Sequence, residues 1–153
     1  MQFFTLSNFF SLVAMVVIGS ATPTPDPEPA SAAFIWTDTQ FDHWLATTDA
    51  NITYYGNTTS NPLAPHDTSI TRVTYCSSLV GDACGGACSV YYGGATCLNA
   101  PDTVCLAATN NVGFCSSAGC IGSCTLLTSC IFQLEGGFCY TPDTKSIIVS
   151  TLW

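Results

Sequence analysis

The chain has very few basic side chains. Arg72 and Lys145 are its only arginine and lysine, against ten aspartate and glutamate residues, and the formal net charge is −8. This balance repels a phosphate backbone and also an anionic lipid surface. We therefore exclude nucleic acid as a partner. We also expect no stable membrane anchoring once the leader described below has been cleaved.

Recognisable catalytic motifs are absent as well. The sequence contains no G-x-S-x-G nucleophile elbow, and its only histidines are His43 and His66. A surface position explains each histidine better than a catalytic one. Glu135, Asp102 and Asp143 are the acids that a glycosidase could use as a pair, but Asp102 and Asp143 each follow a proline and fit Pro-Asp turns. We predict a non-enzymatic protein with no cofactor and no metal.

Cysteine is absent from residues 1–75 and 140–153. All ten cysteines lie in the intervening stretch, and an even number in so short a region predicts a disulfide framework of up to five bridges in an oxidising compartment. The connectivity stays open, because ten cysteines allow roughly 945 complete pairings. The ten are Cys76, Cys84, Cys88, Cys97, Cys105, Cys115, Cys120, Cys124, Cys130 and Cys139.

Two Cys-x3-Cys units stand out, at 84–88 and 120–124. Residues four apart share one face of a helical turn, so each unit could present two sulfurs to the same neighbour from a short helix. The glycines inside the units weaken such a helix by about 1 kcal/mol each relative to alanine. Zinc binding by these thiols is the alternative, which an even cysteine count in a secreted chain disfavours.

The N-terminal part has no features of a folded core. Residues 1–21 are apolar, carry no charged side chain and end in small residues, which predicts a secretory signal peptide. A membrane anchor is the alternative, but the apolar run is short for a span. Residues 22–33 hold four prolines and predict an extended linker or propeptide. We place a single domain at 34–153, with a disulfide-stapled core at 76–139.

Residues that favour strands recur along this domain. β-branched and aromatic residues dominate at 34–38 (FIWTD), 70–75 (ITRVTY) and 146–153 (SIIVSTLW), which predicts strands. A weak internal repeat places Pro-Asp-Thr at 101–103 and again at 142–144. It predicts two related halves, each with a Pro-Asp turn feeding a strand. The expected fold class is a small disulfide-rich domain, β-dominated with one or two short helices.

Two acceptor sequons for N-glycosylation begin at Asn51 and Asn57. Residues 56–68 are rich in glycine, proline, asparagine and threonine, which predicts a loop. Asn57 lies in this stretch and Asn51 lies shortly before it, and we expect both asparagines in an exposed loop. If the chain is secreted, we expect a glycoprotein.

At the cysteine framework the sequence resembles the small secreted cysteine-rich proteins of fungi. The resemblance covers about residues 76–149 and is carried by the block GGATCLNAPDTVCLAATNNVGFC and the later GGFCYTPDTKSIIV. It implies a secreted protein that acts as an effector towards a host or as a component of the wall surface. It supplies no catalytic residues. The adjacent cysteine pair of hydrophobins and of hevein-type chitin-binding domains is missing from this chain.

Aromatic residues in polar surroundings are the candidates for a binding face. These rings could stack on sugars, or they could fill the core of a domain that is poor in large aliphatic residues. They are Trp36, Trp44, Tyr54, Tyr55, Tyr91 and Tyr92, and we single out Trp36, Trp44, Tyr91 and Tyr92 as possible ligand-facing residues. The first hypothesis for function is an effector-like or surface interaction protein located outside the cell or in the wall. A carbohydrate-binding module of the cell wall is the alternative, and a small secreted hydrolase is the third. The partner is thus an extracellular protein or a polysaccharide.

Overall fold

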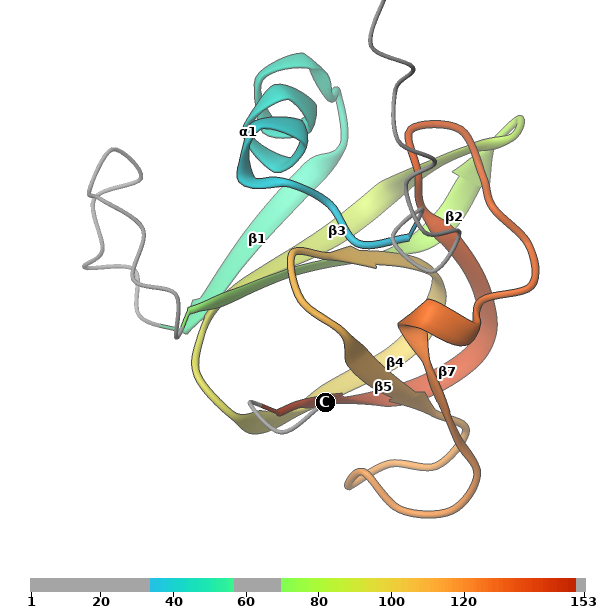
Figure 1. Cartoon of the computed structure of the whole chain (residues 1–153). Helices are drawn as coiled ribbons and strands as arrows, with labels where there is room; N and C mark the ends of the chain where they lie inside the picture. The colour runs from blue at the N-terminus through green and yellow to red at the C-terminus, as the bar shows by residue number, and fades with distance from the viewer. Residues whose placement is uncertain (1–33, 57–69, 151–153) are drawn as a thin grey trace, which may run out of the picture.

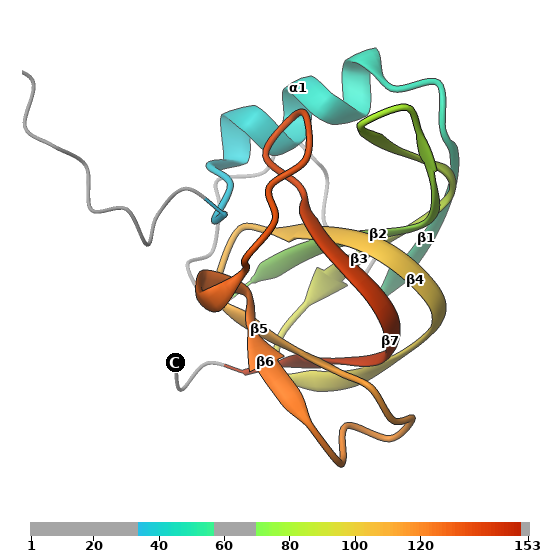
Figure 2. The ribbon, with the colours of Figure 1, turned by 90° about the vertical axis from the view of Figure 1, so that its right-hand side faces the viewer.

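In the computed structural model of the protein, residues 34–56 and 70–150 are described (Figure 1). The predicted signal peptide (1–21) and linker (22–33) lie outside the described residues. Seven strands form one sheet, and an α-helix lies across it (Figures 1 and 2). The elements are α1 (Asp38–Thr47), β1 (Asn51–Gly56), β2 (Thr71–Val80), β3 (Ala83–Gly93), β4 (Thr96–Ala108), β5 (Val112–Cys115), β6 (Cys124–Leu126), the 3-10 turn η2 (Leu127–Ser129) and β7 (Cys139–Val149).

The strands follow the order β1-β3-β2-β4-β7-β5-β6 in the sheet. Neighbours are antiparallel except for β1 and β3, which are parallel. The strands predicted at 70–75 and 146–153 are confirmed where the structure describes them, in β2 and in β7. The fold class is confirmed too: the described chain is a small disulfide-rich β protein with one α-helix and one 3-10 turn.

Two apolar cores lie on opposite faces of the sheet. The sheet curls around the first core, so that β2 and β3 lie across it from β5 and β7 (Figure 2). Val73, Leu106, Val112 and Ile147 are fully buried there. The second core lies between α1 and the outer face of β2, β3 and β4. The helix therefore packs on the sheet through the second core.

Residues 34–38 do not form the predicted strand. Ile35 makes a single β-bridge to Ala108, and α1 begins three residues later. The reason is a capping box: the Thr37 side chain accepts a hydrogen bond from the Gln40 backbone N–H at 3.2 Å, and the Gln40 side chain accepts one from the Thr37 N–H at 2.8 Å. Satisfying these two backbone donors favours a helix start over a longer strand.

The Pro-Asp-Thr repeat appears as two matching bulges in the strands β4 and β7. Asp102 and Asp143 have φ angles of 60° and 63°, and Thr103 lies opposite Thr144 in the strand register. Each threonine hydroxyl donates to the backbone carbonyl three residues earlier, both at 2.9 Å. The register shifts on one side of this pair in β4 and on the other side in β7. The predicted turns are therefore bulges inside long strands, and they help these strands to bend around the first core.

All ten cysteines are paired in the structure, which confirms the predicted disulfide framework. Two bridges join residues directly opposite each other on neighbouring strands, in β2–β3 and in β5–β6. The others connect β3 to β4, connect β4 to the loop before β6, and close the loop before β7. The pairs are Cys76–Cys88, Cys84–Cys105, Cys97–Cys120, Cys115–Cys124 and Cys130–Cys139.

Neither Cys-x3-Cys unit is helical, so that expectation was wrong. Cys84 and Cys88 lie on the strand β3, where residues four apart also share a face. Their sulfurs go to different neighbours, since Cys88 bonds to β2 and Cys84 bonds to β4. Cys120 lies in a loop and Cys124 begins β6. The glycines in both units favour extended or turn backbone over a helix.

Within residues 34–56 and 70–150, no helix has both the length and the apolar character needed to span a bilayer.

Candidate functional site

Five aromatic side chains fill the space between α1 and the sheet, and we call them the aromatic cluster: Trp36, Phe41, Trp44, Tyr92 and Phe138. The Trp36 ring centroid lies 4.7 Å from that of Phe138 and 5.8 Å from that of Phe41, both edge to face. Phe41 meets Tyr92 at 5.9 Å in the same way. Such pairs contribute about 0.5–1.5 kcal/mol each beyond their buried area. The cluster therefore fixes α1 on the sheet.

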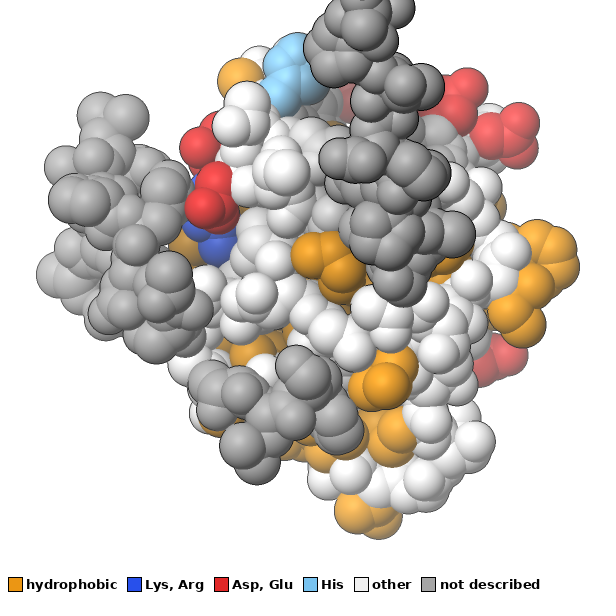
Figure 3. Space-filling view, viewed as in Figure 1, with side chains coloured by type: hydrophobic (Ala, Val, Ile, Leu, Met, Phe, Trp, Pro, Cys, Tyr) orange, Lys and Arg blue, Asp and Glu red, His pale blue; other side chains and the backbone are white. Residues whose placement is uncertain are grey.

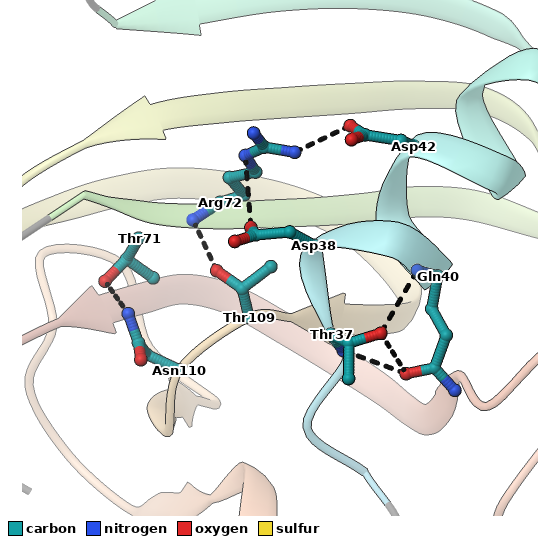
Figure 4. Close-up of polar contacts among 8 residues, drawn as sticks. All are labelled: Thr37, Asp38, Gln40, Asp42, Thr71, Arg72, Thr109 and Asn110. Carbon is teal, nitrogen blue, oxygen red and sulfur yellow. Dashed lines mark hydrogen bonds and ion pairs between the residues drawn. The ribbon is translucent and has the colours of Figure 1, made fainter. Parts of the chain in front are cut away.

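Arg72 of β2 is buried at one end of this cluster, with its side chain only 6% exposed (Figure 4). Its guanidinium donates to the Asp42 carboxylate at 2.7 Å and lies 3.5 Å from a carboxylate oxygen of Asp38, and both acids belong to α1. The same group lies 5.5 Å from the ring centre of Phe41 and 5.6 Å from that of Tyr92. Acids and rings together compensate the buried charge and tie the helix to β2.

The four aromatic residues singled out from the sequence divide into two pairs. Trp36 is 3% exposed and Tyr91 is 9% exposed, so neither ring has a face that a sugar could reach. Trp44 and Tyr92 are half-buried and belong to the aromatic cluster. Burial raises the pKa of Tyr92, while the charge of Arg72 opposes the rise. Trp36, Trp44 and Tyr92 belong to the second core and Tyr91 belongs to the first. The platform expected from these four residues is thus not formed by Trp36 or Tyr91.

Tyr54 on β1 is the aromatic residue that reaches the surface on the α1 side of the sheet. Its side chain is 51% exposed, and its ring stacks on Tyr92 with a centroid separation of 6.3 Å and an interplanar angle of 28°. Tyr92 in turn lies against the Arg72 guanidinium, which is paired with the half-exposed carboxylates of Asp38 and Asp42. We call Tyr54, Tyr92, Asp38 and Asp42 the Tyr54 surface. Sequence reasoning had counted Tyr54 among the aromatic residues in polar surroundings, but not among the four singled out as possible ligand-facing residues.

A second surface lies in the loop closed by the disulfide Cys130–Cys139. Ile131 is 83% exposed and Phe132 is 65% exposed, and Tyr140, whose backbone N–H donates to the Phe132 carbonyl at 2.9 Å, is 37% exposed. We call Ile131, Phe132 and Tyr140 the apolar loop. Hydrophobic side chains gather at the right-hand edge of Figure 3, over the segment before β7. Sequence reasoning missed this surface, although an apolar pair directly after a bridged cysteine was visible.

The backbone directly after Ile131 and Phe132 is held in place by several hydrogen bonds. Gln133 forms a β-bridge with Cys139, and the Leu134 N–H donates to the Phe138 carbonyl at 2.8 Å. The Glu135 N–H donates to the carbonyl of Asp82 at 3.1 Å, which connects the loop to the β2–β3 hairpin. With the disulfide, these contacts limit the conformations open to the exposed pair. Little conformational entropy is then left to lose when a partner binds.

The residues weighed for catalysis lie in three parts of the described fold: on α1, in the neighbouring bulges of β4 and β7, and beside the β2–β3 hairpin. His43 is exposed on α1, while the carboxylate of its neighbour Asp42 is held by Arg72. Asp102 and Asp143 occupy the two bulges described above, where a left-handed backbone conformation explains an aspartate. Glu135 is exposed beside the β2–β3 hairpin. His66 lies outside the described residues.

The sulfurs of Cys76, Cys84 and Cys105 lie within 4.8 Å of one another and are buried. Zinc sites use thiolate ligands. Cys84 and Cys105 are bonded to each other and Cys76 is bonded to Cys88, so none of the three offers a thiolate. The same holds for both Cys-x3-Cys units, whose four sulfurs are all in disulfides. Disulfide bonding explains the cluster without an ion.

The two sequons differ in what can be said of them. Asn51 is exposed and is the first residue of β1, so it lies in a strand and not in the loop that was expected. Asn57 lies outside the described residues. Exposure is the property that a modified asparagine needs, and a glycan can project from an exposed strand position as well as from a loop.

Comparison with known proteins gives no relative: no family model, no curated protein and no solved structure matches the chain.

Proposed function

We propose that the protein is secreted and acts outside the cell as a non-enzymatic, effector-like or surface interaction protein. Its five disulfides are typical of extracellular proteins. In this proposal, residues 1–21 are a cleaved signal peptide and residues 22–33 are a linker or propeptide. The sequons at Asn51 and Asn57 carry N-glycans. The resemblance to small secreted cysteine-rich proteins of fungi points the same way.

The apolar loop is the observation that carries this proposal. Ile131 and Phe132 are consecutive large apolar side chains that are mostly exposed to solvent. They lie on a segment that is closed by the disulfide Cys130–Cys139. Burying a side chain of this size is worth about 1.5–3 kcal/mol. Exposed apolar side chains on a rigid segment often become the buried anchors of protein–protein interfaces. The loop therefore offers a preformed anchor for a partner.

The excess of acidic side chains on the protein limits which partners can bind to it. The described acids are Asp38, Asp42, Asp49, Asp82, Asp102, Glu135 and Asp143. Of the two bases, Arg72 is buried and only Lys145 is exposed. Glu135 lies three residues after Phe132, and its backbone N–H donates to the carbonyl of Asp82. An apolar pocket with a neutral or basic rim complements this surface, whereas an acidic rim would be repelled.

The test uses the mature secreted protein on the surfaces of host or neighbouring cells. The variant Ile131→Ser with Phe132→Ser removes the anchor, and Val80→Ser, which replaces an apolar side chain that is 70% exposed on the β2–β3 hairpin, is the matched control. We expect saturable binding that is retained by the Val80 variant and reduced at least tenfold by the double variant. Equal binding by all three proteins would rule out the apolar loop as the anchor.

Carbohydrate binding is the second candidate, because of the Tyr54 surface. An exposed ring backed by Tyr92 offers a flat face for the apolar side of a sugar, and the carboxylates of Asp38 and Asp42 can accept hydrogen bonds from hydroxyl groups. Co-sedimentation with insoluble chitin and β-glucan tests it. Tyr54→Ala should abolish binding, whereas Tyr55→Ala, equally exposed at 49% but on the opposite face of β1, should not. Binding unaffected by Tyr54→Ala would eliminate this surface.

A further inference from the structure

The strand β1 forms one edge of the sheet. It pairs with β3 in an unbroken parallel register from Asn51–Ala87 to Gly56–Tyr92. Among the described residues, no other strand pairs with it. An edge strand presents backbone N–H and C=O groups that can pair with a further strand.

This edge lacks the devices that usually prevent such pairing. Natural edges carry lysine, proline or a bulge, or they are covered. The sequence of β1, NITYYG, has no charged residue and no proline, and its register shows no bulge. Five of its six residues are exposed, among them Tyr54 and Tyr55. Its composition and exposure therefore favour pairing of β1 with a strand of another molecule.

The sequon Asn51-Ile52-Thr53 lies inside this strand. Asn51 and Thr53 are both exposed and, being two residues apart on a strand, share one face. We propose that an N-glycan on Asn51 shields β1 from pairing with β1 of a second copy of this chain. The inference rests on the proposed secretion and glycosylation. In it, the glycan protects the edge strand in place of the charged residue or proline that β1 lacks.

A second copy is the partner that the strand chemistry favours. Antiparallel pairing of two β1 strands about a two-fold axis puts Asn51 of one copy beside Gly56 of the other and centres on Thr53 and Tyr54. The strand carries no charge, so this contact places no like charges directly opposite each other despite the net charge of −8. A bulky glycan at each end of the six-residue contact prevents the approach. Without glycans the contact is small, and the association is therefore weak and concentration-dependent.

The test compares two substitutions at Thr53 in the full chain made by a glycosylating secretory host. Thr53→Ala and Thr53→Lys both destroy the sequon, so both lack a glycan on Asn51. They differ in that the lysine restores a charged edge. Mass spectrometry determines the occupancy of Asn51, and size-exclusion chromatography with light scattering over a range of concentrations determines the mass in solution.

We expect the occupied wild-type protein and the Thr53→Lys variant to stay monomeric, and Thr53→Ala to approach twice the monomer mass at high concentration. A monomeric Thr53→Ala variant would overturn the inference, and so would association of both variants, because the edge would then not be the contact. An unmodified Asn51 in wild type that remains monomeric would overturn it as well. An occupied Asn51 with a monomeric Thr53→Ala variant would leave the proposed secretion and glycosylation standing while this inference fails.

Discussion

Arg72 should be the most sensitive single polar residue on the α1 side of the sheet. Arg72→Ala removes a hydrogen bond between charged groups at 2.7 Å and two ring contacts near 5.5 Å. Because the side chain of Asp42 is 48% exposed, we take the low end of the range for the hydrogen bond, about 1.5 kcal/mol. The ring contacts add about 1 kcal/mol each. The expected loss in the free energy of unfolding is therefore about 3.5 kcal/mol.

Two further substitutions separate charge from shape. Arg72→Lys keeps the positive charge but loses the planar fork that lies against Phe41 and Tyr92, and it should cost about 1–2 kcal/mol. Asp42→Asn should cost more than Asp38→Asn, since the carboxylate of Asp42 lies 2.7 Å from the guanidinium and that of Asp38 lies 3.5 Å away. The order of these losses distinguishes a specific ion pair from general packing.

Urea unfolding followed by tryptophan fluorescence measures these changes, because Trp36 and Trp44 lie in the aromatic cluster. The control is Lys145→Ala, which removes the other basic residue from an exposed position and should change stability by less than about 0.5 kcal/mol. If Arg72→Ala were as stable as the Lys145 variant, the buried cation would not hold α1 on the sheet, and the account given above would be wrong.

Three other predictions concern the disulfides, the bulges and the tyrosines. Replacing Cys84 and Cys105 together by serine opens a bridge with a sequence separation of 21 and should cost about 3 kcal/mol in urea unfolding; an unchanged midpoint would contradict this. Asp102→Ala and Asp143→Ala should each cost about 1 kcal/mol, because both residues have left-handed backbone angles, whereas glycine at either position should cost less. A large effect at only one of the two sites would show that the bulges are not equivalent. Burial raises the pKa of Tyr75, Tyr91 and Tyr92 above the usual 10.0, so the folded state keeps protons that the unfolded state loses. The free energy of unfolding should therefore be steady below about pH 10 and fall above it. Ultraviolet titration of the folded protein should show that these three phenols ionise at higher pH than the other tyrosines.

The cysteine density and the strand propensities were sufficient to predict the fold class. The strand at 70–75 and the end of β7, from residue 146 to 149, followed from β-branched and aromatic residues that lie half or fully buried in the sheet, whereas the start of β7 at Cys139 was not predicted. The helix was missed because two aromatic residues before Thr37 favoured a strand, while the signal that determines the structure is the Thr37–Gln40 capping box. The hydrogen bonds of this capping box outweighed the strand propensity of the preceding aromatic residues.

The candidate surfaces were harder to predict. Whether Trp36 or Tyr54 is exposed depends on how α1 lies on the sheet, and spacing along the chain carries no information about that. The disulfide pairing depends in the same way on strand order, since Cys84 bonds across the sheet to Cys105 and not to its sequence neighbour Cys88. The sequon at Asn51 was placed in a loop because of its composition, although Ile52, Thr53 and Tyr54 are good strand residues.

The disulfide pairing also affects how the chain responds to proteases. The loops closed by Cys76–Cys88, Cys84–Cys105, Cys97–Cys120 and Cys115–Cys124 overlap one another in sequence. Every peptide bond between Cys76 and Cys124 therefore lies within at least one loop, and a single cut there leaves both pieces covalently joined. Between this series and the last disulfide, only the bonds from Cys124 to Cys130 are unprotected, and Leu127 in their middle is fully buried. A nicked molecule would thus keep its sheet and stay in one piece.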